Sequence, residues 1–294
     1  MTSFEIVPRG SFSLRAAAEF GFGGSLGAPA YDGTMRLAFA VDGFAEHAAV
    51  ALRERDDGTI DGELVGGGDV DAVRRQVARI LSLDHDGGAW AAVGERDPVI
   101  GRLQQEHPGQ RPVLFHSPYE AAAWSIISTR RPALQGAGIR RRLSEEHGAR
   151  FDVAGCAMAA FPLPQQLAKL QSFPDLHERK LGQLRGVAEA ALAGVLDPPR
   201  LTALDPDAAM AQLRTLNGIG PFYASLVLVR ASGTADVAVQ EPRAMASAAR
   251  CYELDAVPDS ATWTALSDRW RPFRTWAMVL LRLASERASA TPSR

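Results

Sequence analysis

The chain has 294 residues, of which 46% are hydrophobic and 22% are charged, a composition typical of a soluble globular protein of about two domains. Its net charge of −2 is far from that of a strongly basic nucleic-acid binder, and its two cysteines, Cys156 and Cys251, are too few for a disulfide scaffold or a cysteine-ligated iron–sulfur cluster. No apolar run reaches the roughly 18 residues of a membrane span and no signal peptide is recognisable at the N-terminus, so we expect a cytoplasmic protein without a membrane partner.

The N-terminal part is predicted to form an antiparallel sheet with one solvated face. Between Phe4 and Leu64 the sequence alternates in short segments, among them 12–14, 35–41 and 49–52, and Asp56–Gly58 is a candidate hairpin turn. The periodicity then changes and predicts a helix over 70–83, whose apolar stripe consists of Val70, Val73, Val77, Ile80 and Leu81.

Helical periodicity dominates after a stretch broken by Pro98, Pro108 and Pro112. Helices are predicted near 118–129, 133–147, 164–171, 176–193, 207–216, 222–231, 242–251, 260–268 and 272–287. We therefore predict an α+β protein with three parts: a small antiparallel sheet domain over 1–110, an all-α core over 111–288 and a frayed tail over 289–294.

Charge is divided unevenly along the chain. Residues 1–110 contain ten arginines and 17 acidic residues, giving −7, whereas residues 111–294 contain 22 basic and 17 acidic residues, giving +5. Attraction to phosphates is screened beyond about 10 Å, so any contact with nucleic acid is expected in the second part.

One segment, Leu216–Ala224 (LNGIGPFYA), has the pattern of a tight turn between two helices. Gly218 and Gly220 flank Ile219, which would anchor the turn, and the following helix would present free amide N–H groups at its positive end. Such a turn binds phosphate through main-chain donors. An isolated match would be read as an ordinary helix–helix turn.

Leu216–Asp236 resembles the hairpin of the helix-hairpin-helix DNA glycosylases, specifically the 3-methyladenine-DNA glycosylase II family. Four further blocks resemble the same family in the same order: 117–127, 161–164, 180–192 and 270–277. The resemblance thus covers most of residues 115–285. The resemblance implies a helical core preceded by a small sheet domain. It implies hydrolysis of the N-glycosidic bond of alkylated or otherwise damaged purines in double-stranded DNA, as in base excision repair. It also implies a monomer without an organic cofactor, with room for an ion held by hairpin carbonyls, and DNA contacts at Asn217, Gly218, Ile219, Gly220 and Ala224.

Two absences narrow the implied activity. Relatives that also cut the DNA backbone have a lysine at the start of the helix after the hairpin, where an amine forms a Schiff base, and this chain has Phe222 there. No four-cysteine motif follows, and the histidines show no metal-ligand spacing. A glycosylase without lyase activity and without a metal site is expected.

The catalytic aspartate of the family has no direct counterpart. Counting without gaps from Gly218 places it on Pro242, next to Glu241, whose carboxylate would stabilise positive charge on the sugar if the loop is one residue shorter. Glu241 would equally serve in the first turn of a helix that begins at Pro242. The two roles are compatible. Asp236 is a weaker catalytic candidate, better explained as a loop residue.

The residues expected around an extruded base also depart from the family. By resemblance, Thr129 and Arg130 in the loop 128–132 would enter the duplex, although Arg130 is slightly better explained as a phosphate contact. Phe222 aligns with a pocket aromatic, with core packing as the alternative. Arg282 stands in place of a tryptophan that stacks on the base in some relatives, which makes the expected pocket more polar.

These departures keep two other hypotheses open. One is a helix-hairpin-helix protein that binds DNA or damage but has lost catalysis. The other is a helical protein with no DNA partner, which would show no salt-dependent binding to DNA.

Overall fold

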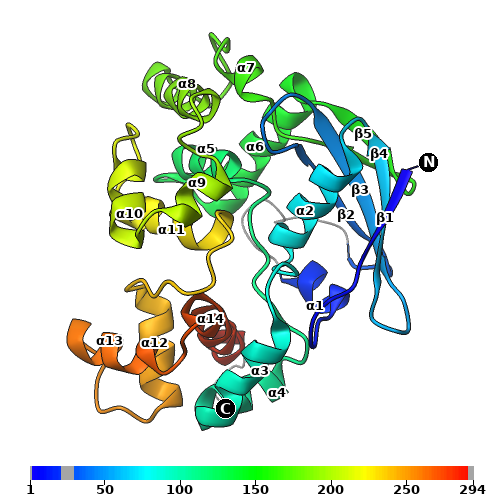
Figure 1. The fold of residues 1–294 in the computed structure, drawn as a ribbon. Helices are drawn as coiled ribbons and strands as arrows, with labels where there is room; N and C mark the ends of the chain where they lie inside the picture. Colours follow the sequence, from blue (N-terminus) through cyan, green and yellow to red (C-terminus); the bar gives the residue numbers. More distant parts are fainter. Residues whose placement is uncertain (1, 21–29, 291–294) are drawn as a thin grey trace.

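The computed structural model describes residues 2–20 and 30–290 (Figure 1). Four antiparallel strands form a sheet in the order β1-β4-β3-β2, with bounds β1 Thr2–Ile6, β2 Met35–Ala40, β3 His47–Glu54 and β4 Ile60–Gly66. The turn predicted at Asp56–Gly58 joins β3 to β4, and Asp57 accepts a hydrogen bond there from the Thr59 amide at 2.9 Å. The segment 12–14, however, is not a strand: a helix, α1 (Leu14–Glu19), begins there because Ser13 caps its N-terminus.

Both faces of the sheet centre are covered. Helix α2 (Val70–Ile80) packs on one face through Val73, Val77 and Ile80, all fully buried, as the predicted stripe requires. A short hairpin, β5 (Arg150–Val153) with β6 (Cys156–Ala159), covers the other face and buries Ala49 and Ala51. The prediction of a solvated face is wrong here, because this hairpin comes from a segment 100 residues later in the chain.

Two helices that the sequence did not predict follow the sheet, α3 (Gly87–Arg96) and α4 (Pro98–Glu106). Asp97 ends α3 and caps the N-terminus of α4. Trp90 and Ile100 from this pair pack with Trp270 and Trp276, near the C-terminal end of the chain. Residues 87–106 therefore share a hydrophobic core with the last helices rather than with the sheet. The sequence assigns them to the sheet domain over 1–110.

The remaining helices follow the predicted order, with one short addition, α9. Their bounds are α5 Pro118–Ser128, α6 Ala133–His147, α7 Pro164–Leu167, α8 Glu178–Leu192, α9 Pro198–Ala203, α10 Pro206–Arg214, α11 Pro221–Ala231, α12 Pro242–Cys251, α13 Ser260–Asp268 and α14 Arg274–Ala290. Helix α14 extends into the tail predicted to fray over 289–294, and residues 291–294 lie outside the described part of the chain. No described helix is both long and apolar enough to span a membrane.

The helices form two groups in space (Figure 1). One core joins α5, α6, α8, α10 and α11, and the other joins α3, α4, α12, α13 and α14. Arg79 of α2 connects the first group to the sheet: it binds the Asp42 carboxylate at 2.7 and 2.9 Å and donates to the Ala231 carbonyl at the end of α11 at 2.8 Å. Helix α11 is thus fixed at its C-terminal end, and its N-terminal end carries the predicted site.

Candidate functional site

The predicted hairpin lies between α10 and α11. Ile219 is 4% exposed and packs into the core of the first helix group, while its amide donates to the Leu216 carbonyl at 3.0 Å. Gly220 is the N-cap residue of α11, and as a glycine it offers no side chain to the first amides of the helix. The N–H groups of Phe222 and Tyr223, at the positive end of α11, therefore have no side-chain cap.

The two glycines of the hairpin are explained by different physical constraints. Gly218 has φ +93°, and a Cβ there would lie 2.6 Å from the Gln183 side chain and 2.7 Å from Ile126. Gly220 has φ −85°, and no atom lies within 4 Å of the place its Cβ would take. Internal packing thus explains Gly218, whereas nothing inside the described structure requires a glycine at position 220.

The other predicted hairpin contacts divide in two. Asn217 is exposed, and its side-chain oxygen accepts a hydrogen bond from Gln183 at 3.3 Å. Ala224 is fully buried and its amide donates to the Gly220 carbonyl at 2.9 Å. Neither the side chain nor the amide of Ala224 is therefore exposed to a ligand, since both are used inside the helix.

A cavity of about 50 Å³ lies along α11, between that helix, the N-terminus of α12 and the N-terminal half of α14. Its lining includes three predicted residues: Phe222, Glu241 and Arg282. Phe222 is 56% exposed, so the alternative of core packing is wrong. The cavity has room for a few water molecules at about 10–15 Å³ each, so a base could enter only if its walls moved apart.

Glu241 both caps a helix and lines this cavity. Its Oε2 atom accepts a hydrogen bond from the Ala244 amide at 2.7 Å at the start of α12, and Pro242 occupies the first helical position. The Oε1 atom lies 4.0 Å from a guanidinium nitrogen of Arg282. The capping role is therefore confirmed, and the second oxygen stays at the cavity.

Asp236, the weaker candidate, is held by arginines. Arg274 donates to one carboxylate oxygen at 2.7 Å, and Arg271 donates to the other at 2.8 Å. Asp236 does not line the cavity. These contacts fix the loop between α11 and α12 against the start of α14.

The loop predicted to enter DNA follows α5. Arg130 is exposed and has φ +57°, whereas Arg131 donates to the Asp175 carbonyl. The Thr129 hydroxyl donates to the Ser125 carbonyl, which closes the last turn of α5. Arg130 is thus the arginine of this loop that extends from the surface.

Sequence reasoning missed the residue that holds this loop. Lys180 of α8, 9% exposed, donates to the carbonyls of Ile127 at 3.1 Å and Thr129 at 2.9 Å. Burial, and secondly the positive charge of Arg131, lower its pKa to about 8. The scarcity of lysine, with Lys169 the only other one, was a signal that could have singled it out.

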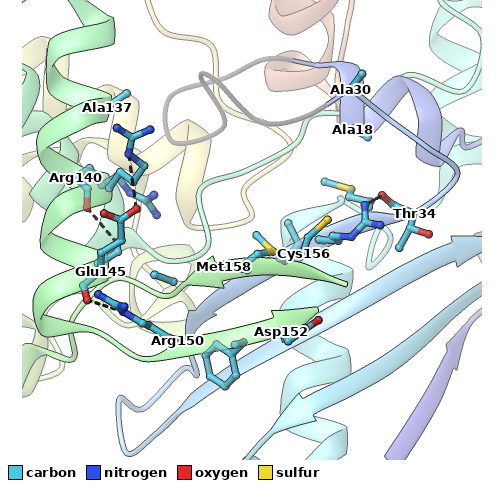
Figure 2. A pocket seen from close by; sticks show the side chains of 18 of the residues that line it. Ala18, Ala30, Thr34, Ala137, Arg140, Glu145, Arg150, Asp152, Cys156 and Met158 are labelled. Atoms are coloured by element: carbon cyan, nitrogen blue, oxygen red, sulfur yellow. Dashed lines mark hydrogen bonds and ion pairs between the residues drawn. The ribbon is translucent and has the colours of Figure 1, made fainter. Parts of the chain in front are cut away.

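A larger groove of about 980 Å³ lies elsewhere, between α6, β2 and the β5–β6 hairpin (Figure 2). Arginines line it, but several are already paired: Arg36 binds Asp32 at 2.8 Å, and Arg150 donates to the Glu145 carbonyl at 2.9 Å. The groove and the small cavity share no lining residue. Charge in the groove is therefore largely internal to the fold.

Solved structures share this arrangement over the whole chain. A 3-methyladenine DNA-glycosylase from Archaeoglobus fulgidus superposes with a TM-score of 0.78 at 20% identity, over 99% of this chain and 100% of that one. The chain has the fold of the helix-hairpin-helix DNA glycosylases. An 8-oxoguanine glycosylase/lyase from Clostridium acetobutylicum, in complex with double-stranded DNA, superposes with a TM-score of 0.65 at 13% identity, over 99% and 98% of the two chains.

Curated proteins with similar sequences carry related names. A Mycobacterium tuberculosis protein named "Probable bifunctional transcriptional activator/DNA repair enzyme AlkA" is 27% identical over 205 residues, which is 68% of this chain and 40% of that protein. A DNA-3-methyladenine glycosylase of Bacillus subtilis is 23% identical over 155 residues, about half of either chain. The chain thus matches about two fifths of the length of the Mycobacterium relative. No family model matches it. The resemblance read from the hairpin and helix blocks is confirmed by these similarities.

Proposed function

We propose that this protein is a DNA glycosylase, which hydrolyses the bond between a damaged base and its deoxyribose in double-stranded DNA. The observation that carries the proposal is the first turn of α11. Its uncapped amides suit a phosphate, and the side chain of Phe222 in that same turn lines the cavity that Glu241 borders. A strand bound at the hairpin would therefore have a base beside the carboxylate.

In this reaction Glu241 would act through its negative charge. As the glycosidic bond breaks, positive charge develops on the sugar, and a carboxylate close to it stabilises that charge and helps to orient the water. The Ala244 amide fixes one carboxylate oxygen by a 2.7 Å hydrogen bond, so the group is held in place before the reaction. Glutamate at this position would replace the aspartate of the family with one more methylene.

A reaction without DNA backbone cleavage fits the residues best. Schiff-base chemistry needs an amine near the sugar, and Phe222 stands where lyase relatives have lysine. Lys180 is occupied by two main-chain carbonyls. Damaged purines, including alkylated ones, are the first substrates to test, given the names of the similar proteins.

The test is release of 3-methyladenine, 7-methylguanine and hypoxanthine from duplex DNA that carries each of these bases, with undamaged duplex as blank. Glu241→Gln keeps an oxygen that can accept from the Ala244 amide, so the helix cap remains while the charge is lost. Its release rate should fall on the order of 10²-fold or more. Glu146→Gln, on the exposed face of α6, is the matched control and should behave as wild type.

Either of two results would decide against an enzyme. DNA binding that weakens with salt, without release of any base, would favour the damage-binding alternative. No binding at all would favour a helical protein without a DNA partner. Release that is equal in wild type and Glu241→Gln would leave a glycosylase whose catalytic group lies elsewhere.

A further inference from the structure

The polar residues of the cavity wall differ in what they can do for a ligand. Ser225 donates to the Phe222 carbonyl at 2.7 Å, and Thr275 donates to the Val237 carbonyl at 2.9 Å. Arg230 is 6% exposed and donates to the Val113 carbonyl at 2.8 Å. These three side chains therefore serve the fold.

Glu241 and Arg282 lie beside each other in the cavity wall, and both side chains are partly exposed. Their side chains are 17% and 29% exposed, and their nearest charged atoms are 4.0 Å apart, the outer limit of an ion pair. The rest of the wall is mostly apolar, with Leu226, Val229, Val239, Met278 and Val279. A partly exposed guanidinium thus lies in a mostly apolar cavity wall, 4.0 Å from the carboxylate proposed for the reaction.

Resting on the proposed glycosylase activity, we propose that Arg282 makes the site selective for neutral damaged bases that carry a carbonyl oxygen, in preference to cationic alkylated bases. The Arg282 guanidinium repels a base that is itself positively charged and so offsets the attraction that the neighbouring Glu241 carboxylate would exert on it. The same cation attracts a carbonyl oxygen, to which its planar N–H groups can donate.

The proposal also gives Arg282 a role in the reaction. When the C1′–N9 bond of a neutral purine breaks, the bonding electron pair leaves with the base, and the negative charge spreads onto its ring nitrogens and carbonyl oxygen. The Arg282 guanidinium stabilises that charge, while Glu241 stabilises the positive sugar. The oxygen of water bonds to C1′, its proton passes through Glu241 to solvent, and the departing base takes a proton from solvent. A cationic base leaves as a neutral molecule and gains nothing from the guanidinium.

The experiment compares three duplexes that differ in a single base. Hypoxanthine is neutral and has a carbonyl, 1,N6-ethenoadenine is neutral and has none, and 7-methylguanine is cationic. Single-turnover release is divided by the spontaneous rate for each base, because the cationic base is intrinsically labile. We expect the enhancement for hypoxanthine to exceed that for either other base by at least about tenfold, as expected for one charged donor.

Variants at one position separate charge from packing. Arg282→Met should lose about 10- to 100-fold on hypoxanthine and keep or gain rate on 7-methylguanine. Arg282→Lys keeps the charge and should keep the order of preference. Arg243→Met, at an exposed position on α12, is the control and should match wild type.

The outcomes distinguish this inference from the proposed function. An enhancement for 7-methylguanine equal to or above that for hypoxanthine, or an equal loss on all three bases in Arg282→Met, would overturn the inference and leave a glycosylase. Failure of wild type to release any base, with DNA binding intact, would overturn the proposed function and the inference with it.

Discussion

Changing each hairpin glycine to alanine separates the stability of the turn from its proposed contact with DNA. Gly218→Ala puts a Cβ on a residue with φ +93°, and that atom would lie 2.6 Å from Gln183 and 2.7 Å from Ile126. A non-glycine residue in the left-handed region costs about 1–2 kcal/mol, and relief of the two contacts adds on the order of 1 kcal/mol. The melting temperature should fall by roughly 4–10 °C.

Gly220→Ala should instead leave stability nearly unchanged and weaken binding to DNA. Its φ of −85° suits any residue and its Cβ meets nothing within 4 Å, so the free energy of unfolding should change by less than about 1 kcal/mol. Affinity for duplex DNA should nevertheless fall about 10- to 100-fold, because the methyl group would hold a phosphate away from the amides of Phe222 and Tyr223. Gly220→Ser strengthens the contrast, since serine at an N-cap stabilises a helix by accepting from those same amides.

Thermal unfolding and fluorescence-anisotropy titration at fixed salt would measure both effects. Wild-type affinity in Gly220→Ala and Gly220→Ser would refute the argument that DNA approaches the backbone at this glycine. An unchanged melting temperature in Gly218→Ala would refute the explanation of Gly218 by internal packing.

Substitutions at three further positions test the framework around the site. Glu120 is 1% exposed and binds Arg140, whose side chain is 13% exposed, at 2.5 Å. Glu120→Ala should cost about 3–5 kcal/mol in urea unfolding, because it removes the buried partner and leaves the guanidinium unpaired. A loss below about 1 kcal/mol would contradict this. Burial raises the pKa of Glu120, but His116 and Arg140 lower it more, to about 2, so the stabilisation is complete above the ordinary value of 4.5 and lost as the pH falls toward 2. The stability gap between wild type and Glu120→Gln should shrink over that window, and a constant gap would count against the pairing. Lys180→Met should lower stability by about 1–3 kcal/mol, measured the same way, since two carbonyls lose their donor; an unchanged value would argue against the clamp. Asp236→Asn should lower the melting temperature while base release continues at the wild-type rate, and abolished release in a folded variant would restore Asp236 as a catalyst.

The parts of the fold that could be predicted depend on local signals. The stripe Val73–Val77–Ile80 specifies a helix face by spacing alone, and the hairpin is specified by two glycines around Ile219. Such signals lie within one or two turns of chain. They do not depend on what the element packs against.

The parts that were missed depend on distant partners. Strands β5 and β6 have four residues each, too few for a recognisable alternation, and they are stabilised by packing on the sheet beside Ala49. Helices α3 and α4 carry glycines and a junction at Pro98, and what buries Trp90 is Trp276, nearly two hundred residues away. Periodicity in one segment contains no information about either partner.

The catalytic candidate was ambiguous for the same reason, since a shift of one residue decided between Pro242 and Glu241. The structure places Pro242 at the first position of α12 and Glu241 at the N-cap, so the two neighbours have separate roles. Proline fixes where the helix begins, and the helix start in turn fixes the carboxylate, because only the N-cap side chain reaches back to the Ala244 amide. What the sequence could not supply is the 4.0 Å approach of Arg282 from α14, 41 residues further on. That approach depends on the packing of α12 against α14, and it makes the charge of the cavity a property of the tertiary fold.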